Sequence, residues 1–167
     1  MVYPPDPNPP WHALFAPLPD DAVPRREPVL APELAARPEG AALAGWEKIS
    51  LDLAAPGGGM RIVLVMVDDA ARPISASDHV MHRSPKPNGE TEIRHESLGG
   101  RFEPDGTFRG TRWSSLIIQS ADDEELETTS TRAEPTEGDV AALRALVAEL
   151  IRRAPPRRDA SPPPPSA

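Results

Sequence analysis

Proline limits what this chain can fold into more than any other residue, because its ring fixes φ and removes a backbone hydrogen-bond donor. The 167-residue sequence contains 23 prolines. Eleven fall in residues 1–40, six in 41–150 and six in 151–167. The excess therefore lies at the two ends. The sequence predicts one domain over 41–153, between a Pro-rich extended arm (1–40) and a disordered Pro-rich tail (154–167).

Charge and composition exclude several classes of protein. The net charge of −8 argues against binding to nucleic acid or to anionic membranes. The absence of cysteine excludes disulfides, thiolate metal sites and cysteine nucleophiles. The start of the chain lacks the basic and then apolar pattern of a secretion signal, and the longest aliphatic run has six residues, 62–67. We expect a cytoplasmic protein without a cofactor.

The middle of the chain has the pattern of an antiparallel meander. Apolar and polar residues alternate over 45–53, and residues 60–69 run apolar on both faces, as in a central strand. More polar strands are expected at 74–83, 91–98, 101–102 and 107–119, joined by short connections that suit antiparallel neighbours. Residues 128–131, within the acidic stretch 122–139, are a candidate edge strand.

A helix is predicted after this sheet. Thr136 and Asp139 have the spacing of a capping box, and Pro155 ends the pattern. Between them runs one apolar stripe, formed by Val140, Leu143, Leu146, Val147, Leu150 and Ile151. The predicted fold class is α+β: an antiparallel meander of about five to six strands with a C-terminal amphipathic helix packed on it.

Two turn sequences predict which side chains share a face of the sheet. If Asn88-Gly89 forms a two-residue type I′ turn, His82 lies opposite His95. A three-residue loop at 104–106 pairs Phe102 with Phe108 and adds Trp113 and Ser115 to the face of His95. This face is a candidate small-ligand site made of His82, His95, Trp113 and Ser115. Two imidazoles at this distance could share a metal if an adjacent strand supplied further ligands, but we assign no metal-ligating residues. The alternative is a half-exposed sheet surface.

The same loop places Arg101 directly opposite Arg109, where two guanidinium groups can bind a phosphate or carboxylate. The alternative is that they pair with nearby acids such as Glu103.

The arm contains aromatic anchors, which solvated segments usually lack. Trp11, Leu14 and Phe15 are spaced so that one helical turn puts them on one face. They either dock on another protein or subunit, or fold back on their own domain.

The sequence contains no nucleophile elbow, metalloprotease motif or phosphate-binding loop. Our first hypothesis is therefore a non-catalytic accessory domain that binds a protein partner, or a second copy, through its arm. The alternative is a small-ligand or metal-binding α+β domain, with or without enzymatic activity, that uses the His/Trp face.

Overall fold

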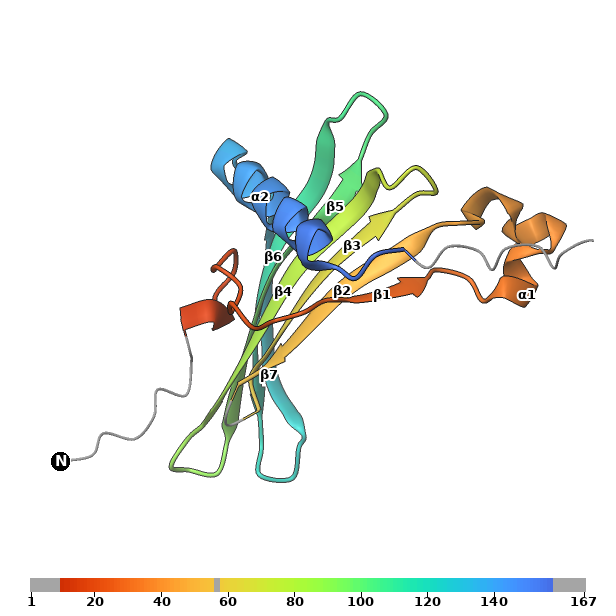
Figure 1. Cartoon of the computed structure of the whole chain (residues 1–167). Coiled ribbons are helices and arrows are strands. Elements are labelled where there is room, and N and C mark those ends of the chain that lie inside the picture. The colour runs from red at the N-terminus through yellow and green to blue at the C-terminus, as the bar shows by residue number, and fades with distance from the viewer. Residues whose placement is uncertain (1–9, 56–57, 158–167) are drawn as a thin grey trace, which may run out of the picture.

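The computed structural model describes residues 10–55 and 58–157. It shows an α+β fold in which a seven-stranded antiparallel sheet runs in chain order, β1 to β7, and helix α2 crosses one face (Figure 1). The strands are β1 (Arg25–Pro28), β2 (Glu47–Ala54), β3 (Met60–Val67), β4 (Pro73–Pro85), β5 (Thr91–Phe102), β6 (Phe108–Gln119) and β7 (Glu125–Ala133). The helices are η1 (Pro10–His12), α1 (Pro32–Ala35), η2 (Pro38–Leu43) and α2 (Glu137–Arg153). The predicted class and meander are confirmed.

The two faces of the sheet differ. On the helix face, the one that α2 covers, Ile49, Val63, Val65, Ala76 and Leu98 form one core with the α2 residues Leu143, Leu146, Val147 and Leu150. On the outer face, β3 presents Ile62, Leu64 and Met66, which are only half-buried. β3 is therefore a central strand that is apolar on both faces, but only its side chains on the helix face are fully buried.

Helix α2 begins with the predicted capping box. The Thr136 hydroxyl accepts from the Asp139 amide at 3.1 Å, and the Asp139 carboxylate accepts from the Thr136 amide at 3.0 Å. Arg152 and Arg153 lie in the last turn, where they interact favourably with the helix dipole. Within the described residues, no helix is long and apolar enough to cross a membrane.

The connections from β2 to β7 share one geometry. In each, the residue before the loop donates its N–H to the carbonyl oxygen of the residue four positions later in the chain. The carbonyl oxygen of the residue before the loop accepts from the N–H of the residue three positions later. The third loop residue has a positive φ: 92° at Gly58, 62° at Ala71, 86° at Gly89, 88° at Gly106 and 60° at Asp123. In the loops at 69–71, 87–89, 104–106 and 121–123, this is the three-residue hairpin loop with a type I turn and a left-handed residue.

This geometry corrects one predicted register. The loop between β4 and β5 has three residues, 87–89, and not two, because only Gly89 takes a positive φ while a type I′ turn requires it at both central positions. His82 therefore lies opposite Arg94, and His95 lies opposite Met81. The shift by one residue moves His82 to the helix face and leaves His95 on the outer face.

The second predicted register is confirmed. Phe102 pairs with Phe108, His95 with Ser115 and Arg101 with Arg109. The pairing continues without a shift through Gly99 and Gly100.

The described part of the arm packs on the domain. β1 extends the sheet next to β2, and Leu18 is buried in the core. Arg153 of α2 donates to the backbone oxygens of Pro19 and Ala22. The sheet therefore includes part of the segment predicted as an arm.

Candidate functional site

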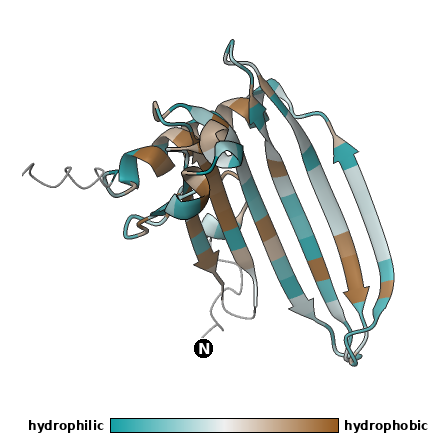
Figure 2. Ribbon diagram, turned by 90° about the vertical axis from the view of Figure 1, so that its right-hand side faces the viewer, coloured by the Kyte–Doolittle hydropathy of each residue, from teal (hydrophilic) through white to brown (hydrophobic). Residues whose placement is uncertain are grey.

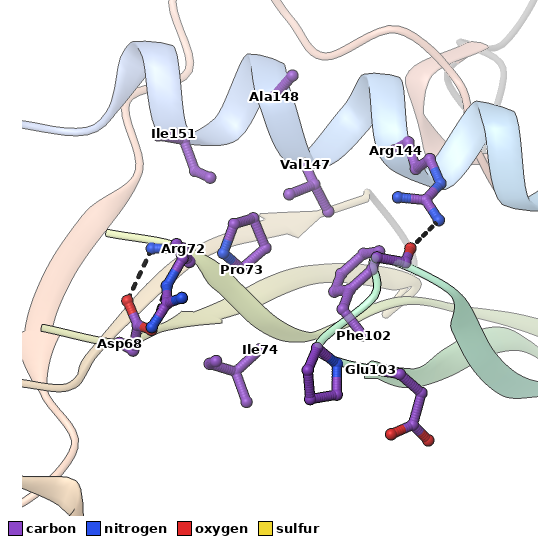
Figure 3. A pocket seen from close by; sticks show the side chains of 12 residues that line it. Asp68, Arg72, Pro73, Ile74, Phe102, Glu103, Arg144, Val147, Ala148 and Ile151 are labelled. Carbon is purple, nitrogen blue, oxygen red and sulfur yellow. Dashed lines mark hydrogen bonds and ion pairs between the residues drawn. The ribbon is translucent and has the colours of Figure 1, made fainter. Parts of the chain in front are cut away.

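A cleft lies between the C-terminal half of α2 and the sheet (Figure 3). This cleft has a volume of about 520 Å³. Three segments line it: the β3–β4 loop with the start of β4, the β5–β6 hairpin and α2. Its walls are mainly apolar, formed by Pro73, Ile74, Phe102, Val147, Ala148 and Ile151.

The hairpin wall depends on two glycines. Phe102 and Phe108 face each other with ring centres 5.2 Å apart. Next to them Gly100 pairs with Gly110, and a Cβ at Gly110 would lie 2.5 Å from the Phe108 ring. Absence of a side chain there lets the Phe108 ring fold over its own strand.

Asp68 and Arg72 form one end of the cleft. The buried Asp68 carboxylate accepts from the amides of Ala70 and Arg72 and from the Arg72 guanidinium, each at 2.9 Å. These hydrogen bonds, led by the Arg72 amide, lower the pKa of Asp68. The carboxylate is an ionised acceptor that holds the turn.

Arg144 of α2 lies at the other end, as Figure 3 shows. Its guanidinium donates to the Gly106 oxygen at 2.6 Å and lies 5.2 Å from the centre of the Phe102 ring. No described carboxylate lies within ion-pair distance of it. Arg144 is therefore a cation beside an apolar cleft, and it contacts two uncharged groups, the Gly106 carbonyl and the Phe102 ring.

Arg101 and Arg109, predicted to bind an anion, do lie together on adjacent strands. Both contact the same oxygen of Glu103, at 3.3 and 3.2 Å, and their side chains are 71% and 72% exposed. The structure thus pairs both arginines with an internal carboxylate, which is the alternative given by the sequence. Binding of an external anion stays a prediction.

The outer face brings three ring side chains together. Nε2 of His79 lies 3.1 Å from Nδ1 of His95. The Trp113 ring stacks on His79, with centres 6.4 Å apart, and is tilted against His95, with centres 5.8 Å apart. Burial lowers the pKa of both histidines; the charge of Asp78 opposes this at His79, and His79 adds to it at His95. His79 thus stands where His82 was expected.

His82 instead contacts the arm. Its ring packs edge-on against His12, with centres 5.1 Å apart, and His12 is only 1% exposed. Burial lowers the pKa of His12, His82 and Arg61 add to this, and the Met60 backbone opposes it. Neither ring nitrogen of His12 makes a well-aligned hydrogen bond within the described residues.

The predicted ligand residues line one groove only in part. A polar groove of about 450 Å³ is lined by His82, His95 and Ser115, together with Arg94, Glu96, Ser114, Leu116, Thr129, Ser130 and Thr131. Ser115 pairs with His95 and so belongs to the outer face, opposite to His82. Its buried Oγ has no hydrogen-bond partner among the described residues. A common ligand face of His82, His95 and Trp113 does not form.

The predicted docking residues have intramolecular contacts. Phe15 packs against the core, and its amide donates to Asp78 at 2.8 Å. Trp11 is half-buried, and its ring lies edge-on to His12. Leu14, between them, is also half-buried. Binding of another protein through these residues stays a prediction.

Sequence reasoning did not identify the cleft. Its walls come from three segments far apart in the chain, and no local pattern joins them. The sequence did contain one signal. Arg144, Val147 and Ile151 have helical spacing, so this arginine lies on the same side of the helix as part of the apolar stripe.

Within residues 10–55 and 58–157, no group of three or more His, Asp or Glu side chains is placed to hold a metal ion. No protein-family model, curated protein or solved structure matches the chain.

Proposed function

We propose that this protein is a non-catalytic binding domain for a small amphipathic anion, held in the cleft between α2 and the sheet. The observation that carries the proposal is Arg144, a cation without a carboxylate partner among the described residues, at the end of a mainly apolar cleft. The apolar body of the ligand would lie against Phe102, Ile74 and Val147, and its anionic group would bind Arg144.

The size and chemistry of the cleft support a small-molecule ligand. Pockets for such ligands measure roughly 300–1,000 Å³ and combine apolar walls with a few polar groups that fix orientation. The volume of about 520 Å³ falls in this range. A guanidinium is suited to carboxylate or phosphate because it offers parallel N–H donors.

The acidic side chains of the cleft favour binding over catalysis. Asp68 is occupied by the Ala70 and Arg72 donors and has a lowered pKa, so it is a poor proton donor or acceptor near neutral pH. Glu103 is neutralised by Arg101 and Arg109.

The test uses two probes that differ in charge, decanoate and 1-decanol, titrated into 15N-labelled full-length protein and followed by amide chemical shifts. Decanoate is expected to shift the amides of Gly106 and Val147. Arg144→Gln should weaken decanoate binding by roughly tenfold, equivalent to about 1.4 kcal/mol for a lost charged hydrogen bond. Its effect on decanol should be small.

Two alanines of α2 provide a matched control. Ala148 lines the cleft, whereas the exposed Ala145 does not. Ala148→Trp should fill the cleft and abolish binding of both probes, and Ala145→Trp should leave binding unchanged. The proposal is wrong if neither probe shifts the cleft amides, or if both tryptophan variants bind equally well.

A further inference from the structure

The two edges of the sheet differ in how far they are open to another strand. β7 is the last strand in the sheet order, and no further element of the described residues lies beyond it at that edge of the sheet (Figure 2). All nine of its residues are exposed. β1, at the other edge, has only four residues and ends in Pro28, which cannot donate a backbone hydrogen bond.

The backbone groups of β7 that face outward follow from the hairpin geometry. The hydrogen bond from Glu103 to Thr107 closes the β5–β6 ladder. Hydrogen-bonded and non-hydrogen-bonded pairs alternate along an antiparallel ladder. The backbone groups of odd-numbered residues of β6 therefore bond to β5, and those of even-numbered residues bond to β7. Thr129 and Thr131 lie opposite the even-numbered Leu116 and Ser114, so their backbone groups bond to β6.

The N–H and C=O groups of Thr128, Ser130 and Arg132 therefore point away from β6. They present a free row of donors and acceptors along an edge whose centre contains only threonine and serine. Neither proline nor lysine, the residues that usually protect such an edge, occurs in β7.

The side chains make this edge self-complementary. Glu125 lies at the start of β7, and the Thr128 hydroxyl donates to its carboxylate, so both lie on the outer face. Arg132 lies near the end of β7 and on the same face, since it pairs with Trp113. Two antiparallel copies would place the acidic end of each strand beside the basic end of the other.

We propose that a second copy of this chain pairs antiparallel with β7 and joins the two sheets into one. With Thr129 on the two-fold axis, Thr128 lies opposite Ser130 of the second copy, and Arg132 lies opposite Leu126. Glu125 of the second copy is next to this position and, because of the register shift at Ile118/Gln119, on the same outer face as Arg132. The symmetry forms the contact between Arg132 and Glu125 twice. The hydroxyl pairs and charge pairs each favour this register.

Sedimentation velocity of the full chain over a range of concentrations tests the proposal. The wild type is expected to show a monomer–dimer equilibrium. Ser130→Pro removes an outward N–H and should abolish the dimer, with the urea unfolding midpoint of the monomer nearly unchanged. Ser130→Ala keeps that N–H and should still dimerise. A wild type that stays monomeric, including one whose β7 binds an extended peptide of another protein, overturns the proposal.

A charge exchange tests the register without relying on proline. Glu125→Arg and Arg132→Glu should each weaken self-association by roughly tenfold, because like charges then lie beside each other in both contacts. An equimolar mixture of the two variants should form heterodimers with near wild-type affinity. A dimer that either variant leaves unchanged, or a mixture that does not recover, contradicts pairing through β7.

Discussion

Arg61 and Asp78 form a completely buried, bidentate ion pair across β3 and β4, with N–O distances of 3.0 and 2.9 Å. The arm closes over this pair. Nη1, the guanidinium nitrogen of Arg61 that does not bind Asp78, donates to the backbone oxygens of Trp11 and Ala16, at 2.5 and 2.9 Å, and the Phe15 amide donates to Asp78. A buried pair needs such additional hydrogen bonds to offset its loss of hydration. The ion pair is thus the anchor of the arm.

Removing one partner should cost far more than removing both. Arg61→Met leaves the Asp78 carboxylate buried without its counterion, so the free energy of unfolding should fall by about 3–5 kcal/mol. Arg61→Met combined with Asp78→Leu should recover most of this loss. Urea denaturation with a constant m-value measures both effects. Equal stability of the single and double variants would contradict this role of the pair.

The histidine cluster should make the protein sensitive to mild acid. The pKa values of His79 and His95 lie below the ordinary 6.5 in the folded state. Folding therefore favours the neutral imidazoles. Their contribution to the free energy of unfolding is complete above about pH 6.5 and is lost as the pH falls through the folded-state pKa values. His12, whose pKa is also lowered, acts in the same direction.

The measurement is the urea unfolding midpoint between pH 7.5 and 5, above the range in which most carboxylates titrate. The wild type should lose stability towards pH 5. The double variant His79→Gln, His95→Gln should have a flatter profile, because the lowered pKa values of His79 and His95 then no longer contribute. Parallel profiles for the two proteins would show that the cluster does not titrate as its burial implies.

Gly110 and Gly138 allow a matched comparison. A Cβ at Gly110 would lie 2.5 Å from both the Gly99 oxygen and the Phe108 ring, whereas at Gly138 it would meet only the Thr136 hydroxyl at 3.8 Å. Gly110→Ala should lower the free energy of unfolding by about 1–3 kcal/mol through overpacking. Gly138→Ala, in the first turn of α2, should raise it by about 0.5–1 kcal/mol. Thermal unfolding measures both, and a tolerated Gly110→Ala would show that both the Phe108 ring and the backbone at Gly99 move easily.

Local chemistry predicted the elements that depend on neighbouring residues. The capping box and stripe of α2 are of this kind, as is the β5–β6 register determined by Asp105 and Gly106. The β4–β5 register was wrong although Asn88 and Gly89 have the same roles. The Asn88 side chain accepts from the Glu90 amide just as the Asp105 side chain accepts from the Thr107 amide.

The features that sequence reasoning missed depend on distant partners. Arg61 is a single charge in an apolar run, and its partner Asp78 lies on the next strand within a more polar sequence. His12 is buried only because the arm returns to the sheet. The cleft joins α2 to two hairpins that lie tens of residues earlier. None of these relationships has a local pattern.

The shared hairpin geometry leads to a last prediction, at Ala71. Its φ of 62° is unfavourable for a residue with a Cβ, by roughly 1–2 kcal/mol. Ala71→Gly should relieve this strain and raise the free energy of unfolding by about 0.5–1 kcal/mol, because the greater freedom of glycine in the unfolded chain offsets part of the gain.

Gly106→Ala is the matched reverse change, since Gly106 has a φ of 88° and an added Cβ would meet nothing within 4 Å. It should lower stability by about 1 kcal/mol through backbone conformation alone. Urea denaturation measures the free energy of unfolding of both variants. If both variants raise it, or both lower it, the left-handed loop residue does not control the stability of these hairpins.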